Sequence, residues 1–282
     1  MSAAPAMTPH ATPAPAATPA RLGVPALATM AREGTKIVML TAYDASFAAL
    51  AERAGIDVLL VGDSLGMVIQ GHASTLPVTL ADVVYHTRCV AVGCRRPLII
   101  ADLPFGSYQE SPAQAYAASV AALQAGAQMV KLEGGAWLAP TVEFLTVRGV
   151  PVCGHVGLQP QSVNVLGGYR AQGKTADAAA AVLADAHALV AAGASLLVVE
   201  CVPRALGESL TAAAGAPVIG IGAGPACSGQ VLVVYDALGI QPGRAARFVR
   251  NFMAGADSVE AALAAYAVAV KDGSFPGPEH CF

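Results

Sequence analysis

Aromatic and charged residues are both scarce in this sequence of 282 residues, at 5% and 12%. The formal net charge is only −3, so no excess of positive charge favours binding to nucleic acid or to an anionic membrane surface. The low aromatic content further weakens a base-stacking interpretation. Every apolar run is interrupted by Gly, Pro or an acidic residue well before the roughly 18 residues that a membrane-spanning helix needs. We therefore expect a soluble protein with no nucleic-acid or membrane partner.

The six cysteines form neither a Cys-x-x-Cys motif nor a pair with zinc-ligand spacing. We expect reduced thiols in a cytoplasmic protein, most of them small residues of the core. Residues 1–20 are rich in Ala and Pro and lack the cationic start and apolar centre of a signal peptide. This composition predicts a disordered extension, followed by a single catalytic domain over residues 21–282.

A pattern recurs along the chain in which an apolar run of strand length ends in an acidic residue. The acids at these endings are Asp63, Asp102, Glu133 and Glu200. Continuous apolar runs are typical of parallel strands with helices on both faces, and a carboxylate inside such a strand would be costly. At the carboxyl end of a strand the same acid faces a solvent-accessible mouth. Four such endings predict one site that is supplied by several strands.

Eight expected strands alternate with helices at intervals of about 25–40 residues, which predicts an α/β fold of the (β/α)8 TIM barrel class. A doubly wound open sheet is the alternative, but it would bring a glycine fingerprint directly after the first strand, and residues 41–44 contain no glycine. We expect a short helix at 25–31 to plug the barrel floor and C-terminal helices at 244–253 and 258–271 to close the domain. The expected strands are residues 36–41, 58–63, 97–101, 128–132, 150–154, 195–199, 217–221 and 230–234.

In such a barrel the acids of the second, third and fourth strands meet at one mouth. Asp63, Asp102 and Glu133 would repel one another unless a cation shares them, and ligation by carboxylates alone favours a hard ion such as Mg²⁺. Lys131 lies two residues before Glu133, so both side chains point the same way on a regular strand. A lysine in this position suits the carboxylate of a small substrate. Glu200 is separated from these acids by the fifth strand and is available as a base.

These residue types together predict carbon–carbon chemistry through an enolate. A divalent ion that holds a 2-oxo acid through its keto and carboxylate oxygens lowers the cost of forming the enolate, and a carboxylate can then remove the adjacent proton. The simpler interpretation is that strand-end acids cap helices or bond to loops. His155 is either a hydrogen-bonded core histidine or a substrate-binding donor to the keto oxygen.

Two glycine-rich segments imitate phosphate-binding motifs. Residues 168–175 match the P-loop pattern G-x-x-x-x-G-K-[ST], but a working P-loop follows a central strand directly, and here the polar stretch 159–164 comes before it. We expect a lid near the mouth rather than a nucleotide site. Residues 220–224, Gly-Ile-Gly-Ala-Gly, fit either a phosphate loop or a tight turn around a bulky ligand.

Seven segments carry a specific resemblance from residue 36 to the C-terminus. They are Met39-Leu-Thr-Ala-Tyr-Asp44, Val61-Gly-Asp-Ser-Leu-Gly-Met67, Gly71-His72 with Ser74-Thr-Leu-Pro-Val-Thr79, Ala101-Asp-Leu-Pro-Phe105, Val130-Lys-Leu-Glu-Gly-Gly135, Gly154-His-Val-Gly-Leu158 with Pro160-Gln-Ser162, and Gly220-Ile-Gly-Ala-Gly224. In this order they resemble the ketopantoate hydroxymethyltransferase family.

The resemblance implies a barrel of the phosphoenolpyruvate/pyruvate type, assembled as a homo-oligomer, typically a homodecamer. It implies transfer of a hydroxymethyl group from 5,10-methylenetetrahydrofolate to 3-methyl-2-oxobutanoate through a Mg²⁺-stabilised enolate, giving 2-dehydropantoate for pantothenate biosynthesis. The resemblance also assigns roles to six residues. Asp63 and Asp102 would bind one Mg²⁺ per subunit beside the keto acid, Glu133 would complete the metal site directly or through water, Ser64 would contact the keto acid, Lys131 would hold its carboxylate, and Glu200 would take the C3 proton.

Three positions depart from the family pattern: Ala73, Ser228 and Tyr235. None belongs to the expected metal or base set, so they leave only the pterin or lid contacts open. A second enzyme interpretation is a carbon–carbon lyase of the isocitrate-lyase or phosphonopyruvate type, but the Lys-Lys-Cys-Gly-like lid motif of those enzymes has no match here. A catalytically inactive barrel would have lost one or more of the four acids, and all four are present.

Overall fold

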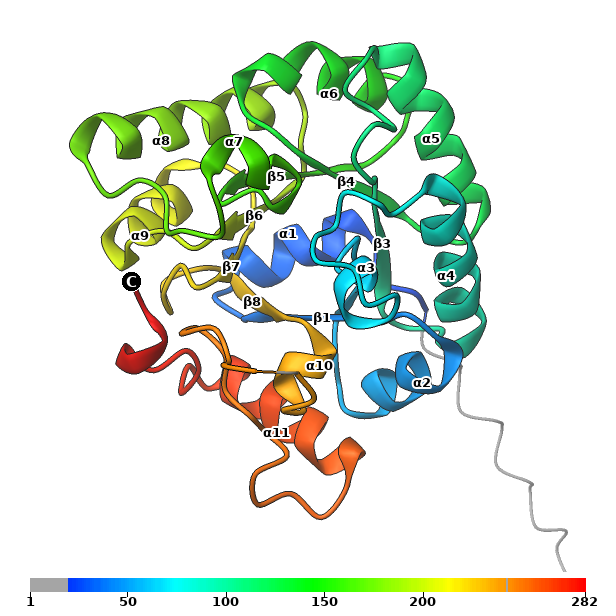
Figure 1. The fold of residues 1–282 in the computed structure, drawn as a ribbon, viewed down its shortest axis with the longest axis vertical. Helices are drawn as coiled ribbons and strands as arrows, with labels where there is room; N and C mark the ends of the chain where they lie inside the picture. Colours follow the sequence, from blue (N-terminus) through cyan, green and yellow to red (C-terminus); the bar gives the residue numbers. More distant parts are fainter. Residues whose placement is uncertain (1–19, 242) are drawn as a thin grey trace, which may run out of the picture.

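The computed structural model describes residues 20–241 and 243–282 and shows a closed barrel of eight parallel strands (Figure 1). Each strand pairs with the next along the chain, and β8 returns to pair with β1. The expected barrel is therefore confirmed, while nearly all of the expected N-terminal extension lies outside the described residues. The strands are β1 (Ile37–Thr41), β2 (Val58–Val61), β3 (Leu98–Asp102), β4 (Met129–Glu133), β5 (Val152–Gly157), β6 (Leu196–Glu200), β7 (Val218–Ile221) and β8 (Gly229–Leu232).

Helices surround the ring of strands, and several begin at side-chain caps that the sequence supplies. Asp44 accepts a hydrogen bond from Phe47 N, and Thr79 forms a reciprocal capping box with Asp82. The helices are α1 (Val24–Arg32), α2 (Ala45–Arg53), α3 (Leu65–Val68), α4 (Leu80–Gly93), α5 (Pro112–Gln124), α6 (Ala139–Thr146), α7 (Val163–Leu166), α8 (Ala176–Ala191), α9 (Arg204–Ala213), α10 (Val234–Ala237) and α11 (Val259–Lys271), with 3-10 turns η1 (Ala136–Leu138), η2 (Pro160–Ser162) and η3 (Pro278–His280). None of these helices is long and apolar enough to span a lipid bilayer.

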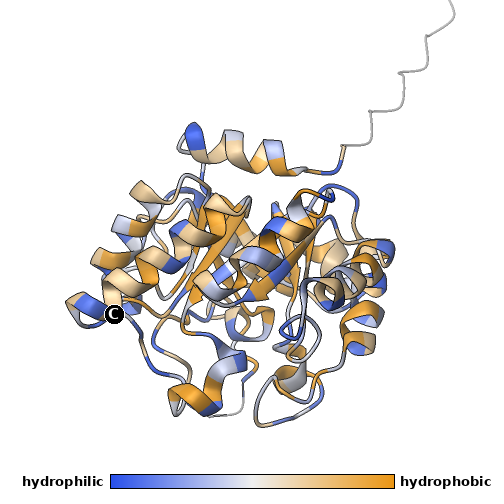
Figure 2. Cartoon of the chain, turned by 90° about the horizontal axis from the view of Figure 1, so that it is seen from above, coloured by the Kyte–Doolittle hydropathy of each residue, from blue (hydrophilic) through white to orange (hydrophobic). Residues whose placement is uncertain are grey.

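The hydrophobic core has two layers because alternate strand residues point in opposite directions. Ile37 and Met39 of β1 point into the barrel, whereas Val38 and Leu40 pack outward against the helices. Helix α1 lies across one end of the barrel (Figure 2), where its Leu27 joins the interior layer. The expected plug at the barrel floor is therefore present, and the opposite end, where the strands finish, is left for the site.

Two expectations about local structure are wrong. No helix forms over residues 244–253, because the backbone N–H of Phe252 donates to Ala237 O at 2.8 Å instead of to a carbonyl of its own segment, and Gly243 has a φ of +99°. Strand β5 extends to Gly157 rather than ending at 154, since its ladder with β6 continues. His155 therefore lies within the strand, paired with Glu133 on one side and Val198 on the other.

The P-loop-like segment does not follow a strand. It comes after α7, and the hydroxyl of its last residue, Thr175, accepts a hydrogen bond from Ala178 N and caps α8. The segment lies near the barrel mouth, where Tyr169 and Ala171 line the cavity described below. The segment therefore lies near the mouth, as expected, while its role as a lid stays a prediction.

Candidate active site

The strand register brings the predicted acids together. Asp102 pairs with Lys131 across β3 and β4, and Lys131 and Glu133 face the barrel interior as alternate residues of β4. Asp63 follows β2, and its backbone N donates to Asp102 Oδ2 at 3.3 Å. One carboxylate oxygen from each of Asp63, Asp102 and Glu133 lies within 4.8 Å of the others, and all three residues are buried.

Lys131 offsets part of this negative charge. Its Nζ donates to Asp102 Oδ1 and Oδ2 at 2.7 and 2.8 Å and to Glu133 Oε1 at 3.2 Å. Burial alone would lower the pKa of Lys131, but Asp102, Glu133 and Asp63 outweigh it and raise that pKa well above its ordinary value. The ammonium group therefore stays charged inside the protein.

One lysine does not balance three acids. Burial raises the pKa of Asp63 well above its ordinary value, and the charges of Asp102 and Glu133 raise it further. Burial also raises the pKa of Asp102, although Lys131 acts against it. The arrangement therefore favours a positive charge or a proton beside Asp63. Three buried carboxylates with no nitrogen or sulfur donor in the set fit a hard divalent cation such as Mg²⁺.

A polar residue outside the predicted set, Gln161 of η2, fixes the position of the acids. Its Nε2 donates to Asp63 Oδ2 and to Leu103 O, both at 2.9 Å, and its backbone N donates to Glu133 Oε2 at 3.0 Å. Tyr108 in turn donates its hydroxyl to Gln161 Oε1 at 2.6 Å. The sequence offered only one signal for this residue, its place in the segment Pro160-Gln-Ser162 that contributes to the family resemblance.

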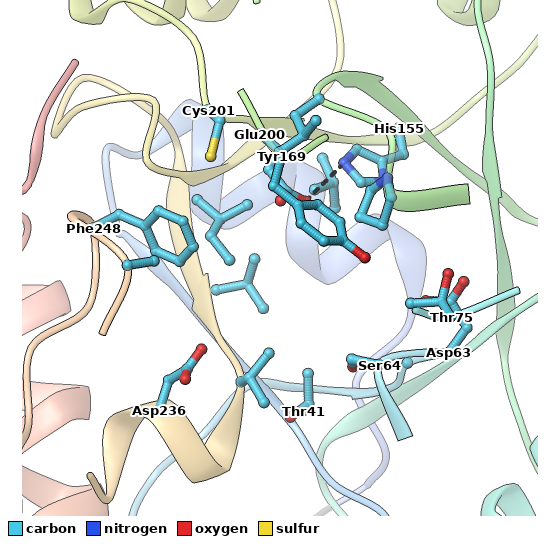
Figure 3. Close-up of a pocket in the computed structure, with 18 of the residues that line it drawn as sticks. Thr41, Asp63, Ser64, Thr75, His155, Tyr169, Glu200, Cys201, Asp236 and Phe248 are labelled. Carbon is cyan, nitrogen blue, oxygen red and sulfur yellow. Dashed lines mark ion pairs between the residues drawn. The ribbon is translucent and has the colours of Figure 1, made fainter. Parts of the chain in front are cut away.

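His155 connects the acid cluster to Glu200. Its Nδ1 lies 3.2 Å from Glu133 Oε1, and its Nε2 lies 3.3 Å from Glu200 Oε2, an ion-pair distance at which hydrogen-bond alignment is poor. Burial and Lys131 would lower the pKa of His155, but Glu133 and Glu200 outweigh them and raise it to about 9. A charged imidazole therefore stands between the carboxylates of Glu133 and Glu200, and Figure 3 shows its ring beside Glu200.

A cavity of about 590 Å³ at the carboxyl ends of the strands contains all the predicted site residues. The Glu200 side chain is 15% exposed, whereas those of Asp102, Lys131, Glu133 and His155 are 4% exposed or less. Ser64 is hydrogen-bonded through Oγ to the hydroxyl of Tyr43 at 2.8 Å. The predicted residues that line the cavity are Asp63, Ser64, Asp102, Lys131, Glu133, His155 and Glu200.

The backbone next to Glu200 adopts unusual conformations. Cys201 has a φ of +48°, which is uncommon for a residue other than glycine, and Gly157 on the neighbouring strand has a φ of +89°. A Cβ atom on Gly157 would collide with the carbonyl oxygen of Glu200.

Five of the six free cysteines are buried, and burial raises the pKa of Cys153 to about 12. This confirms the expectation of cysteines in the core.

The three departures from the family pattern are absent from the cavity lining in the described part of the chain. Tyr235 packs its ring against Tyr43 and Phe47, with centroids 6.1 and 6.3 Å apart. Ser228 accepts a hydrogen bond from Val218 N at 3.2 Å, beside the start of β7. Tyr235 therefore packs behind Tyr43, the residue that is hydrogen-bonded to Ser64, whereas Ser228 lies at the start of β7.

An eight-stranded barrel with buried acids and a lysine at the carboxyl ends of its strands has the architecture of a barrel enzyme. Solved structures with the same fold include phosphonopyruvate hydrolase, with a TM-score of 0.59 and 15% identity over 77% of this chain and 83% of that chain. Another is 2,3-dimethylmalate lyase, described as a PEP mutase/isocitrate lyase superfamily member, with a TM-score of 0.55 and 17% identity over 77% and 82%. These likenesses show the same barrel fold.

The sequence model of the ketopantoate hydroxymethyltransferase family matches residues 21–278, and the chain belongs to this family. A relative from Thiobacillus denitrificans (strain ATCC 25259 / T1), named 3-methyl-2-oxobutanoate hydroxymethyltransferase, is 62% identical over 256 residues, or 91% of this chain and 97% of the relative. A relative of the same name from Azoarcus sp. (strain BH72) is 61% identical over 257 residues, or 91% and 95%. The chain is therefore an enzyme of the transferase class, as the resemblance predicted.

Proposed function

We propose that this enzyme transfers a hydroxymethyl group from 5,10-methylenetetrahydrofolate to 3-methyl-2-oxobutanoate and releases 2-dehydropantoate. The observation that carries the proposal is the meeting, in one cavity, of a three-acid cluster, a buried lysine and a separate carboxylate, Glu200. This set provides what enolate chemistry on a 2-oxo acid needs: a cation site, a partner for the substrate carboxylate and a base.

Asp63, Asp102 and Glu133 would hold the Mg²⁺ ion. When bound there, Mg²⁺ would polarise the keto group of the substrate and lower the cost of forming its enolate. Lys131 would bind the substrate carboxylate, because its ammonium group is buried, charged and at the cavity wall. Ser64, which follows β2 and is hydrogen-bonded to Tyr43, would contact the same substrate.

Glu200 would remove the C3 proton of the oxo acid. Its side chain is more exposed to the cavity than those of the three-acid cluster, and the charged His155 ring keeps one of its oxygens in place at 3.3 Å. A carboxylate at the cavity wall is a side chain of the type that serves as a general base. The enolate carbon would then bond to the one-carbon unit of the folate, water would supply the hydroxyl oxygen, and tetrahydrofolate would leave.

Deuterium exchange at C3 tests the role of Glu200 without any folate. We expect the enzyme with Mg²⁺ to exchange this proton in D2O, and Glu200→Gln to lower the exchange rate by about 10²–10⁴-fold while the oxo acid still binds. The matched control is Glu208→Gln, an exposed glutamate of α9, which should exchange like the wild type. Unchanged exchange in Glu200→Gln would remove this residue from the role of base.

Turnover measured with and without methylenetetrahydrofolate tests the donor. A hydroxymethyltransferase requires the folate, whereas a carbon–carbon lyase of the same fold does not. The expected homodecamer and the cytoplasmic location stay predictions.

A further inference from the structure

The cavity extends well beyond the acid cluster. Its volume of about 590 Å³ lies within the roughly 300–1,000 Å³ that is typical of pockets for drug-sized ligands, whereas 3-methyl-2-oxobutanoate is a much smaller acid. The wall farther from the acids includes Asp236 of α10 and Phe248 of the segment after α10. Figure 3 shows both side chains on the side of the cavity opposite to Asp63 and His155. The cavity therefore has room for a second molecule beside the oxo acid.

Asp236 is an acid without a partner on this wall. Among the described residues, no donor forms a hydrogen bond with its carboxylate, and burial raises its pKa to about 6. Its backbone is held firmly, because the neighbouring Val234 N donates to Thr41 Oγ1 at 2.9 Å at the start of α10. The carboxylate is half-buried at the cavity wall, so a ligand that supplies N–H groups there would give it the hydrogen bonds that the protein does not provide.

We propose that Asp236 and Phe248 form the subsite for the pterin ring of the folate donor. The two oxygens of one carboxylate match the two adjacent donors of a 2-amino-4-oxopyrimidine edge, the ring N–H and the 2-amino group. Phe248 offers an aromatic face for the flat bicyclic ring. This subsite rests on the proposed function, in which a reduced folate is the co-substrate.

Two arginines at the rim agree with this orientation. Arg244 and Arg247 also line the cavity, and both are exposed. Arg247 is partly fixed, because its Nε donates to Glu279 O at 3.3 Å. With the pterin edge at Asp236, the anionic glutamate tail of the folate would leave the cavity past these two guanidinium groups, which suit carboxylates.

Titration calorimetry with tetrahydrofolate under anaerobic conditions tests the subsite. We expect Asp236→Asn to raise the dissociation constant of tetrahydrofolate by about 10–100-fold, since a charged acceptor of two hydrogen bonds is lost. An analogue without the 2-amino group should bind at least about 10-fold more weakly than tetrahydrofolate to the wild type, and this difference should shrink in Asp236→Asn. Asp257→Asn, an exposed aspartate of the C-terminal part, is the matched control.

C3 deuterium exchange of the oxo acid, measured without folate, separates this subsite from the proposed function. Exchange should be retained in folded Asp236→Asn. Equal tetrahydrofolate affinity in the variant and the wild type, or loss of exchange in the variant alone, would overturn the subsite. Absence of exchange in the wild type would instead refute the proposed function.

Discussion

Replacement of Gln161 by leucine tests whether the acid cluster depends on a neighbour that binds no substrate itself. The change keeps a side chain of similar size and removes the amide that donates to Asp63 Oδ2 and Leu103 O at 2.9 Å. A hydrogen bond to a charged group contributes about 1.5–3 kcal/mol, and removal of a group that orients metal ligands lowers metal affinity by roughly 10–100-fold. We therefore expect the dissociation constant for Mg²⁺ or Mn²⁺ to rise by about 10–100-fold.

The same substitution should also lower the free energy of unfolding by about 1–3 kcal/mol. Leu103 O loses a buried donor, whereas the hydroxyl of Tyr108 keeps a second acceptor, Glu133 O, at 2.9 Å. The backbone N–H of residue 161 still donates to Glu133, so the cluster is loosened rather than dismantled. Thermal unfolding without metal measures this part of the effect separately from the binding.

Electron paramagnetic resonance of Mn²⁺ added to metal-free protein measures the affinity directly. The matched control is Gln159→Leu in the same loop, whose side chain has only a loose contact of 3.5 Å with Ser162 Oγ. We expect the control to bind Mn²⁺ like the wild type. A folded Gln161→Leu variant that binds Mn²⁺ within twofold of the wild type would refute the reasoning, because the amide would then be merely structural.

Three further outcomes follow from the structure. Mg²⁺ at about 100 times its dissociation constant should stabilise the fold by about 2.7 kcal/mol, seen as a higher melting temperature, and Asp63→Asn should lose this shift; an equal shift in the variant would place the ion elsewhere. Gly157→Ala places a residue with a Cβ atom in a left-handed backbone conformation, where the Cβ would collide with the Glu200 carbonyl oxygen. The melting temperature and the rate of C3 exchange should therefore both fall, and full retention of both would contradict the contact. Burial raises the pKa of Asp236 to about 6 in the folded protein, from its ordinary value of 3.8, which is the value expected in the unfolded chain. The folded protein therefore holds this proton more tightly, and stability is lost as the pH rises from about 4 to 6. Asp236→Asn should therefore gain up to about 3 kcal/mol at pH 7.5 and little at pH 4, and equal gains at both pH values would argue against the burial of charge.

The sequence was sufficient to predict the barrel and the cluster because both follow from repetition. Each of these strands forms from an apolar run that helices cover, and an acid follows at its carboxyl end. Closure of the barrel then brings the carboxyl ends of strands that are distant in the sequence to one mouth. The alternation of side chains placed Lys131 and Glu133 on one face, as the structure confirms. Glu200 and His155 also line the predicted mouth, although their chemical roles stay proposals.

Features that depend on loop geometry could not be predicted. Gln161 reaches Asp63 from a 3-10 turn after β5, and no local pattern distinguishes it from Gln159 two residues earlier. The segment 244–253 has the composition of a helix, yet tertiary bonds such as Phe252 N to Ala237 O outweigh its propensity. As a result this segment brings Phe248 into the cavity wall, a position that helical periodicity did not indicate.

The charges at the barrel mouth suggest why a metal ion and an oxo acid would bind as a pair. With all three acids ionised, Lys131 and the charged His155 leave the cluster one negative charge in excess, and burial makes this excess costly. A divalent cation alone would leave an excess positive charge, and a monoanionic oxo acid alone would add to the negative one. Together they would bring the cluster to neutrality. The same buried charges that are unfavourable in the free protein would then select a ligand pair of matching total charge.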